Sequence, residues 1–474
     1  MNFKEKHLIA VEDNSVFESS VEEMLEKIEL DKTGSCWDKN NVFEYTRKQL
    51  LELINLSKDE KINMPLYGLS VGFKDLFAIE GLRTTAGSKF LEDFITPYNS
   101  QMWEILKSKG ALLGGKLAMD EFAMGSFSNT SEFGKVSIPN FPDRSAGGSS
   151  GGSASAMASK LFDFTIGSDT GGSVRIPASF CSVVGYKPSY GSFSRYGMVS
   201  YASSLDQAGF FTKNLEDLSY LLQSEISSKD KRDTTSVGLG NYKIIDKSKF
   251  SVAYFPEIFE YNGVQDSIKL AYKKTIDDLI SEGVYLKPVK VPLMEKAVQI
   301  YYIIACAEAS SNLARYQGIY FGKRLIDERF DGSFWDQVSQ LRSKYFGVEV
   351  QKRIMLGSFM LSSENFGALF EKSKILRKKM TEDLTKILEE VDVMVLPTSS
   401  IISPKWEDIE KMTSAEIYMT DFMTVPFSLT GLPAVSTPNH KNAQGLGIGM
   451  QWVGKKYMDY QLIHDVKKIG DCYY

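Results

Sequence analysis

The sequence has little of what several kinds of active site require. Only three of its 474 residues are histidine, so neither a Ser-His-Asp triad nor a histidine-rich metal centre is expected. The four cysteines are far apart and form no C-x-x-C pair, which argues against a zinc ribbon and a disulfide framework and favours a reducing compartment. No apolar run reaches about 18 residues, so no membrane-spanning helix is expected.

Basic charge is also in short supply. The chain has 55 Lys and Arg residues against 60 Asp and Glu residues, a formal net charge of −5. Binding to nucleic acid relies on a basic face that meets the phosphates, so any role with nucleic acid is expected to depend on a partner. The hydrophobic content of 43% and charged content of 24% are those of a folded globular protein.

Helix and strand patterns alternate along the chain, which predicts an α/β protein. Apolar residues at helical spacing predict helices over residues 16–30, 41–56 and 363–390. The apolar run LSVGF predicts a short strand that ends at Lys74. A charged stretch rich in Ser and Thr, residues 227–240, is expected to be a surface loop.

Two glycine-rich loops are the most unusual feature of the sequence. They are GGSSGG at residues 147–152 and GSDTGGS at residues 167–173. Neither contains the Lys-Ser or Lys-Thr pair of a P-loop, and neither has the G-x-G-x-x-G spacing of a dinucleotide-binding turn. Nucleotide binding by these loops is therefore not expected.

A serine on a tight glycine-flanked turn has another chemical use. The turn exposes the hydroxyl group to substrate, while neighbouring main-chain N–H groups can converge on the oxygen that becomes negative during acyl transfer. Such a serine needs a base, and with histidine scarce the candidate is a lysine. Lys74 ends an apolar strand, where burial can lower its pKa from the usual value of ~10.4.

Together these residues resemble the amidase signature family of Ser-Ser-Lys hydrolases. Both loops match, and the separations of 75 residues between Lys74 and Ser149 and 24 between Ser149 and Ser173 are typical of that family. The resemblance implies a Ser-cisSer-Lys triad. Ser173 would attack an amide carbonyl, Ser149 would relay its proton, and Lys74 would act as base and then as acid.

The resemblance also implies roles for the rest of the second loop. The main-chain N–H groups of Thr170, Gly171, Gly172 and Ser173 would form the oxyanion hole. Asp169 and Arg175 would support the loop rather than take part in catalysis, and no metal is expected. The implied fold is α/β with a mixed central sheet flanked by helices, divided into an N-terminal helical region, residues 1–62, and a catalytic domain, residues 63–474.

Within the family, several segments resemble the glutaminase subunits of tRNA-dependent amidotransferases more closely than they resemble stand-alone amidases. These segments are residues 84–89, 119–125, 203–207, 307–313 and 353–357. The likeness implies hydrolysis of glutamine to release ammonia, which partner subunits use with ATP to convert Glu-tRNA(Gln) into Gln-tRNA(Gln).

Three further residues carry over as a glutamine site. Arg353 would hold the substrate α-carboxylate, Asp421 the α-amino group, and Tyr301 would line the pocket. A guanidinium group binds a carboxylate through two parallel hydrogen bonds, and a carboxylate binds an ammonium group as an ion pair. The alternatives are a surface ion pair for Arg353, which lies in the polar segment KRIMLGS, and a core position for Tyr301.

The same resemblance implies the partners and cofactors. The partners would be a tRNA-binding kinase subunit, the B subunit of the amidotransferase, and a small third one, either the C subunit or a fungal substitute. ATP and Mg would be used by the kinase partner, with no cofactor in this chain. Ser145-Ala146 replaces a usual Val-Pro pair, and Leu76 a common Asn. Such divergence favours the mitochondrial matrix over the bacterial cytoplasm, although the N-terminus has no standard transit-peptide character.

Two other functions are compatible with the sequence. A stand-alone amidase acting on another small amide would keep the triad, but Arg353 and Asp421 would not bind glutamine. An inactive scaffold would keep only the fold, and the intact set of Lys74, Ser149 and Ser173 argues against it.

Overall fold

The computed structural model describes residues 1–240, 244–291 and 293–471. Within these residues, eleven strands form one sheet in the order β1-β3-β2-β6-β8-β7-β12-β13-β11-β9-β10. The strands are β1 (Cys36–Trp37), β2 (Ser70–Lys74), β3 (Leu112–Leu117), β6 (Phe164–Asp169), β7 (Val184–Lys187), β8 (Gln207–Thr212), β9 (Ser251–Tyr254), β10 (Tyr285–Pro288), β11 (Val393–Pro397), β12 (Ala434–Lys441) and β13 (Gly447–Val453). A separate hairpin pairs β4 (Ser137–Ile138) with β5 (Phe141–Ser145).

Parallel and antiparallel pairs occur in the same sheet. β2 pairs in parallel with β3 and β6, and β9 pairs in parallel with β10 and β11. The remaining pairs of this sheet, such as β6 with β8 and β12 with β13, are antiparallel. The mixed α/β sheet expected from the sequence is therefore confirmed.

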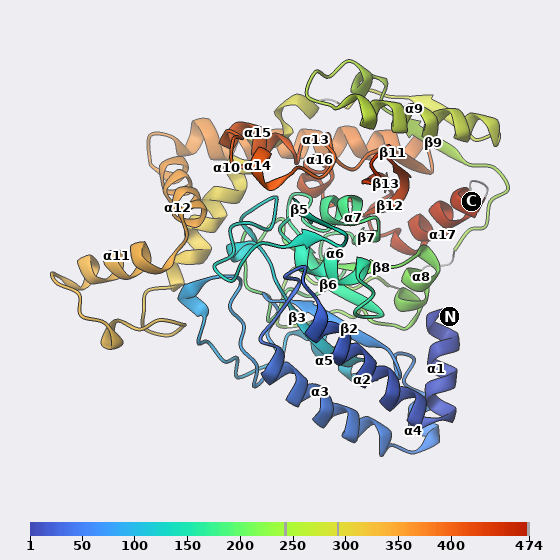
Figure 1. The fold of residues 1–474 in the computed structure, drawn as a ribbon. Coiled ribbons are helices and arrows are strands. Elements are labelled where there is room, and N and C mark those ends of the chain that lie inside the picture. The colour runs from blue at the N-terminus through green and yellow to red at the C-terminus, as the bar shows by residue number, and fades with distance from the viewer. Residues whose placement is uncertain (241–243, 292, 472–474) are drawn as a thin grey trace.

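Helices surround the sheet, with α1 to α4 along one end of the molecule and α10, α12 and α13 toward the other (Figure 1). The α-helices are α1 (Phe3–Glu12), α2 (Asn14–Leu30), α3 (Lys39–Ile54), α4 (Lys58–Ile62), α5 (Gln101–Ser108), α6 (Gly151–Ala158), α7 (Arg175–Cys181), α8 (Leu215–Gln223), α9 (Asp266–Ser281), α10 (Met294–Asn312), α11 (Phe334–Tyr345), α12 (Val348–Leu361), α13 (Lys372–Glu390), α14 (Trp406–Ile409), α15 (Ser414–Met419), α16 (Val425–Leu429) and α17 (Asp459–Asp471). Short 3₁₀ turns are η1 (Lys89–Leu91), η2 (Glu121–Ala123), η3 (Pro256–Phe259), η4 (Leu313–Arg315) and η5 (Leu325–Asp327), and η6 (Phe366–Glu371) is π-helical.

The N-terminal region contains more structure than its sequence pattern predicts. The expected helices at residues 16–30 and 41–56 correspond to α2 and α3, but α1 was not expected. It forms because Asn2 and Glu5 make a reciprocal capping box and because one side of the helix is buried against the rest of the protein. The region also contributes β1, which pairs with β3 of the main sheet.

Two other segments have more detail in the structure than the sequence predicts. The single helix expected over residues 363–390 is divided into the π-helical turn η6 and the α-helix α13. Residues 227–240 contain neither helix nor strand, and the side chains of Asp230 and Asp233 tie the segment to Ser194 and Arg195. The chain beyond this segment returns to the same sheet through β9.

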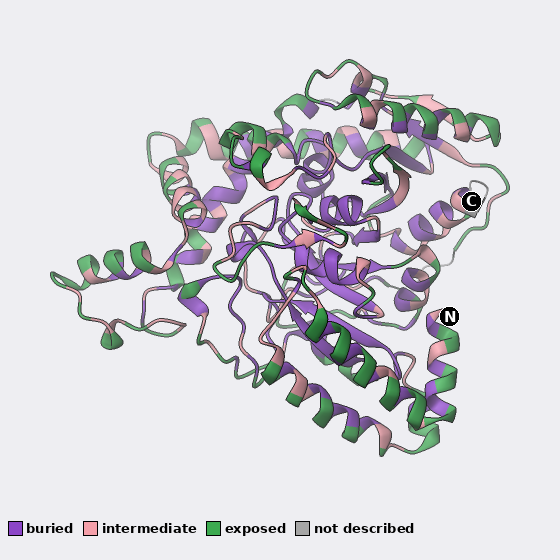
Figure 2. Ribbon diagram, viewed as in Figure 1, coloured by how far each residue is buried: buried purple, intermediate pink, exposed green. Residues whose placement is uncertain are grey.

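Burial is greatest at the centre of the sheet. β2, β3, β6, β8 and β13 are buried along their whole length, and Figure 2 shows purple strands inside helices whose outward faces are green. Because β2 and β6 are adjacent and parallel, their carboxyl ends lie at the same edge of the sheet. Lys74 ends β2 and Asp169 ends β6, so this edge brings the lysine to the second glycine-rich loop.

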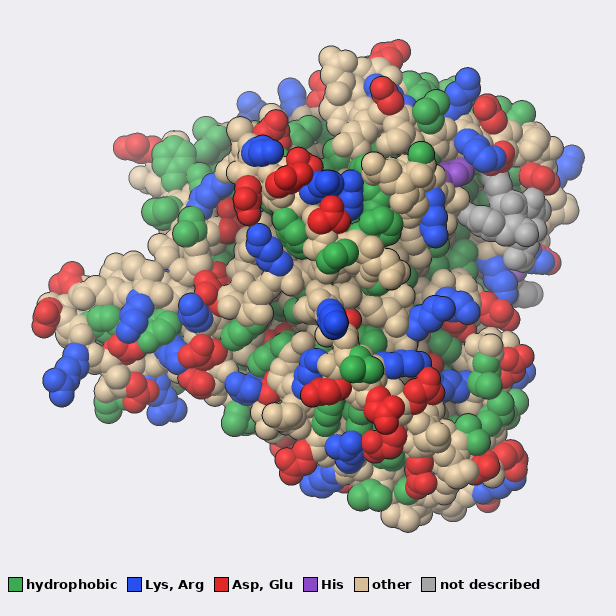
Figure 3. All heavy atoms as spheres, viewed as in Figure 1, with side chains coloured by type: hydrophobic (Ala, Val, Ile, Leu, Met, Phe, Trp, Pro, Cys, Tyr) green, Lys and Arg blue, Asp and Glu red, His purple; other side chains and the backbone are tan. Residues whose placement is uncertain are grey.

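The outer surface carries mixed charge. On the face drawn in Figure 3, Lys and Arg side chains alternate with Asp and Glu side chains, and hydrophobic groups lie between them. Among the residues that the structure describes, no helix is long and apolar enough to cross a membrane.

Candidate active site

Lys74 lies at the centre of the site and is fully buried. Its Nζ atom donates hydrogen bonds to the hydroxyl oxygens of Ser149 (2.8 Å), Ser150 (2.9 Å) and Ser168 (2.8 Å). Burial lowers the pKa of Lys74 to about 7, although nearby carboxylates, of which Asp120 has the largest effect, favour the charged form. A neutral amine is therefore available near neutral pH, as a lysine base requires.

Ser149 lies in the first glycine-rich loop, between β5 and α6, and the Gly148–Ser149 peptide bond is cis. The main-chain N–H of Asp120 donates to the Ser149 carbonyl (3.2 Å). The Asp120 carboxylate accepts hydrogen bonds from the main-chain N–H groups of residues 128–130. A Cβ atom at Gly148 would lie 2.1 Å from Asp120 Oδ2, so only glycine allows the loop to approach this carboxylate.

Ser173 lies on the turn between β6 and α7, and it is partly exposed whereas Ser149 is buried. The main-chain N–H of Ser150 donates to the Ser173 carbonyl (3.2 Å), which joins the two glycine-rich loops. Among the hydrogen bonds of the described residues, none links the Ser173 hydroxyl group to Ser149. The structure thus brings Lys74 and Ser149 into direct contact and places Ser173 on the adjoining loop.

Two glycines of the second loop are packed closely against other segments. A Cβ atom at Gly171 would lie 2.8 Å from the Tyr301 hydroxyl oxygen, and one at Gly172 would lie 2.3 Å from Thr424 Oγ1. Tyr301 belongs to α10, and Thr424 immediately precedes α16. Two distant segments therefore hold the turn that would supply the oxyanion hole.

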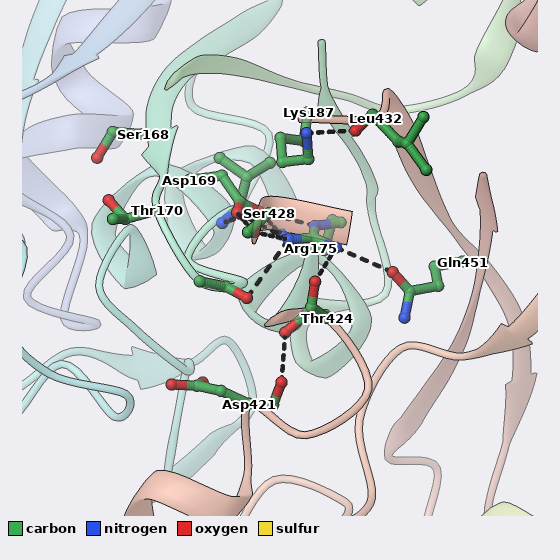
Figure 4. A network of polar contacts seen from close by, with 12 residues as sticks. Ser168, Asp169, Thr170, Arg175, Lys187, Asp421, Thr424, Ser428, Leu432 and Gln451 are labelled. Carbon is green, nitrogen blue, oxygen red and sulfur yellow. Dashed lines mark hydrogen bonds and ion pairs between the residues drawn. The ribbon is translucent and has the colours of Figure 1, made fainter. Parts of the chain in front are cut away.

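Asp169 and Arg175 form a fully buried ion pair beneath this turn (Figure 4). Two hydrogen bonds of 2.9 Å join Arg175 Nε and Nη2 to the two carboxylate oxygens. Arg175 also donates to the Thr424 carbonyl (3.0 Å), Gln451 Oε1 (3.0 Å) and Ser428 Oγ (2.8 Å). Burial by itself would raise the pKa of Asp169, but Arg175 outweighs this and holds the pKa below its usual value. The guanidinium group is occupied by protein acceptors, as in a structural support.

Arg353 is buried on α12, with 3% of its surface exposed. It therefore does not occupy the surface position that its polar sequence segment also allowed. Its Nε atom donates to Glu349 Oε1 (2.8 Å), and Nη1 donates to the Tyr201 hydroxyl oxygen (2.8 Å). The guanidinium carbon lies 5.3 Å from the centre of the Tyr302 ring. Aromatic rings and one carboxylate thus hold the arginine toward the interior.

Asp421 approaches Arg353 through the same tyrosine. The Tyr302 hydroxyl group donates to Asp421 Oδ2 (3.1 Å). Burial raises the pKa of Asp421 to about 7, while the hydrogen bond from Tyr302 and the charge of Arg353 act in the opposite direction. Tyr301, the next residue along α10, contacts Gly171, so the predicted glutamine-binding residues adjoin the second glycine-rich loop.

Several residues of this site are not singled out from the sequence. They are Ser150, Ser168, Tyr201, Asp206, Tyr302, Glu349 and Thr424. The two serines lie within the glycine-rich segments, where proximity to the proposed triad is a usable signal. Asp206 accepts a hydrogen bond from Thr170 Oγ1 (2.7 Å), across a separation that no local pattern encodes. Tyr302 and Glu349 reach the site on the helices α10 and α12, whereas Tyr201 and Thr424 lie outside helices.

A comparison with protein families supplies the classification. The family model described as Amidase matches residues 19–463. The chain belongs to the amidase family. This amidase is 40% identical over 420 residues to the A subunit of glutamyl-tRNA(Gln) amidotransferase from Sulfolobus acidocaldarius, covering 86% of each chain. It is 40% identical over 415 residues to the protein of the same name from Pelagibacter ubique, covering 86% of the amidase and 84% of the relative.

A solved structure is also similar to this amidase. The crystal structure of the A subunit of glutamyl-tRNA(Gln) amidotransferase from Thermotoga maritima matches with a TM-score of 0.71 and 31% identity, over 94% of the amidase and 92% of that chain. In the part of the amidase that the structure describes, no group of three or more His, Cys, Asp or Glu side chains could hold a metal ion. Cys36, Cys181 and Cys306 are free thiols, and Cys472 lies outside the described residues.

Proposed function

We propose that this chain is the glutaminase subunit of a tRNA-dependent amidotransferase. It would hydrolyse glutamine to glutamate and ammonia, and partner subunits would use the ammonia to convert Glu-tRNA(Gln) into Gln-tRNA(Gln). The observation that supports the proposal is that the predicted catalytic residues and the predicted glutamine-binding residues adjoin the same loop, residues 167–173. The contact of Lys74 with Ser149 adjoins this loop on one side, and Tyr301 packs against Gly171 on the other, next to the pair of Tyr302 and Asp421.

In the first half of the reaction, Ser173 Oγ attacks the side-chain carbonyl carbon of glutamine. Its proton passes to Ser149 Oγ, and the Ser149 proton passes to the neutral Lys74 amine. The carbonyl oxygen becomes negative and accepts hydrogen bonds from main-chain N–H groups of residues 170–173. The protonated lysine then returns a proton through Ser149 to the departing nitrogen, so ammonia leaves and an ester forms on Ser173.

In the second half, a water molecule attacks the ester carbonyl. Lys74, neutral again, accepts a proton from this water through Ser149. The C–O bond to Ser173 breaks, the proton returns to Ser173 Oγ, and glutamate leaves. The proton count closes because Lys74 begins and ends the cycle as a neutral amine.

Arg353 and Asp421 would select the substrate. The guanidinium group would hold the α-carboxylate, and the Asp421 carboxylate would hold the α-ammonium group. Glu349 already neutralises part of the charge of Arg353, so a substrate carboxylate would share this arginine with Glu349 and Tyr201. Both contacts are available to glutamine and not to a simple aliphatic amide.

The partners would divide the remaining work. The kinase subunit would bind tRNA and use ATP and Mg, and the small third partner, bacterial-type or a fungal substitute, would complete the complex. The names of the relatives identify those proteins as amidotransferase subunits, which supports an assembly of this kind. The mitochondrial matrix stays a prediction, with the bacterial cytoplasm as its alternative, and subcellular fractionation would decide between them.

The test is ammonia release by the purified chain from glutamine, asparagine and a simple aliphatic amide, with and without the kinase subunit and charged tRNA. Glutamine is expected to be preferred, and the partner complex to raise the rate. Ser173→Ala is expected to abolish turnover without loss of folding, and retained turnover would refute the triad. If wild type cleaves simple amides and ignores glutamine and partner, it is a stand-alone amidase.

A further inference from the structure

Glu121 is a buried carboxylate that the proposed reaction does not use. It belongs to the short turn η2, and 1% of its surface is exposed. One oxygen accepts a hydrogen bond from Ser88 Oγ (2.5 Å), and the other accepts one from the main-chain N–H of Gly347 (2.8 Å). Among the described residues, no Lys, Arg or His side chain forms an ion pair with Glu121. Burying a carboxylate without a cation costs free energy, so we expect its hydrogen bonds to serve a role.

The bond to Gly347 places this carboxylate at the start of α12. Gly347 is the residue before the first turn of α12, and it has no side chain with which to cap the helix. A Cβ atom at Gly347 would lie 2.3 Å from Glu121 Oε2. The side chain of Glu121 therefore supplies the hydrogen-bond acceptor that this helix N-terminus lacks. A segment 226 residues earlier in the chain therefore fixes where α12 begins.

α12 in turn carries the arginine of the proposed glutamine site. Glu349 lies in its first turn, and Arg353 lies one turn further along on the buried face. An α-helix rises about 1.5 Å per residue, and hydrogen bonds join each turn to the next. A change in the position of its first turn would therefore be transmitted to the Arg353 guanidinium group.

The residue before Glu121 is tied to the catalytic loop. The main-chain N–H of Asp120 donates to the Ser149 carbonyl (3.2 Å), while Glu121 holds Gly347. The dipeptide Asp120-Glu121 thus connects the loop of Ser149 with α12, the helix that carries Arg353.

We propose that Glu121 is a positioning residue that sets the distance between the Ser149 loop and Arg353, and thereby the preference for glutamine over amides without an α-carboxylate. This role rests on the proposed function. It depends on two hydrogen bonds and not on charge, because a glutamine at this position can accept from Gly347 and donate to Ser88.

The experiment compares Glu121→Ala, Glu121→Gln and Glu22→Ala by steady-state ammonia release from glutamine and from a simple aliphatic amide. Glu121→Ala is expected to raise KM for glutamine about tenfold or more, with a smaller change in kcat. The ratio of kcat/KM for glutamine to that for the aliphatic amide should fall by a similar factor. Glu121→Gln is expected to stay within about threefold of wild type.

Glu22→Ala is the matched control, because Glu22 is an exposed glutamate of α2 that pairs with Arg47 on the surface. It should keep the wild-type ratio. An unchanged KM for glutamine in Glu121→Ala, or an equal loss for both substrates, would overturn the positioning role. A Glu121→Gln variant as impaired as Glu121→Ala would overturn the claim that geometry and not charge decides.

A second measurement separates this role from the glutamine proposal. Hydrogen exchange of the main-chain amides of α12 should speed up in Glu121→Ala and in Gly347→Ala, and not in Glu22→Ala, whatever the substrate. If exchange in α12 is faster in these two variants but the wild-type protein does not hydrolyse glutamine, Glu121 anchors α12 and the proposed glutamine site is wrong. Unchanged exchange in both variants would refute the anchoring itself.

Discussion

At the scale of single residues, Lys74 and Asp421 are ionisable groups whose pKa values burial moves toward one another. The pKa of Lys74 falls to about 7, and the pKa of Asp421 rises to about 7. Lys74 must be neutral to act as a base, and Asp421 must be ionised to hold an ammonium group. Each active form has lost a proton, so lowering the pH removes both.

This gives a pH dependence that differs between substrates. Below about pH 6, kcat/KM for glutamine should fall by about two log units per pH unit, because both Lys74 and Asp421 become protonated. For a simple aliphatic amide only Lys74 matters, and the fall should be about one log unit per pH unit. Initial rates at limiting substrate between about pH 5 and 8 would measure both slopes.

Asp421→Asn supplies the control for this prediction. The variant should lower kcat/KM for glutamine and leave a single-proton slope for it. Equal slopes for glutamine and the aliphatic amide in wild type would contradict the role of Asp421, and no decline for either substrate would contradict the role of Lys74.

At the scale of elements, the turn between β6 and α7 is held by two segments that contact its consecutive glycines. Tyr301 on α10 reaches Gly171, and Thr424 before α16 reaches Gly172. The buried pair of Asp169 and Arg175 ties the base of the turn to the same Thr424. The N–H groups of the turn therefore have a fixed direction, which is what stabilisation of an oxyanion requires.

Gly172→Ala tests whether this close packing matters. The added Cβ atom would lie 2.3 Å from Thr424 Oγ1, so the turn must shift away from α16. We expect kcat for ammonia release to fall by about 10²–10³-fold, the usual cost of losing an oxyanion donor. Thermal unfolding followed by circular dichroism would check that the fold is retained.

The matched control is Gly470→Ala, because a Cβ atom at Gly470 meets no atom within 4 Å. This variant should keep the wild-type kcat. A Gly172→Ala variant that also keeps the wild-type kcat would show that the turn is not the oxyanion hole.

At the scale of the whole molecule, the charge distribution bears on how a glutaminase could take part in tRNA chemistry. The net charge is −5, and basic and acidic side chains are intermingled on the face drawn in Figure 3. Binding to nucleic acid takes most of its free energy from basic groups that displace counterions from the phosphates. Only ammonia has to pass between the proposed active sites, so this chain does not itself need to hold tRNA.

The isolated chain should therefore bind tRNA weakly. At about 150 mM salt we expect a Kd weaker than about 10⁻⁵ M, within the range of non-specific binding. The complex with the kinase subunit should bind at least tenfold more tightly. Filter binding with labelled tRNA at several salt concentrations would measure both values. Tight binding by the isolated chain, with a steep dependence on salt, would contradict this division of work.

The parts of the site that the sequence predicts lie in contiguous segments. Lys74 ends a recognisable strand, and Ser149 and Ser173 lie in glycine-rich loops that match neither of the common phosphate-binding motifs. The shortage of histidine pointed to a lysine base. By contrast, α1 was missed although Asn2 and Glu5 form a capping box that the sequence shows, because the helix has little amphipathic patterning and is stabilised by burial against distant residues. The π-helical turn η6 has no distinct sequence pattern.

The sequence by itself therefore determined the candidate chemistry and the α/β class, because both follow from short segments whose residue types and spacing are local properties. Only the tertiary structure decided which side chains meet around the predicted site. Tyr302 meets Asp421, Tyr201 meets Arg353, and Glu121 meets Gly347, each across more than a hundred residues. Such contacts depend on how the helices pack against the sheet and against one another, and side-chain packing between distant segments leaves no periodic signal in the chain.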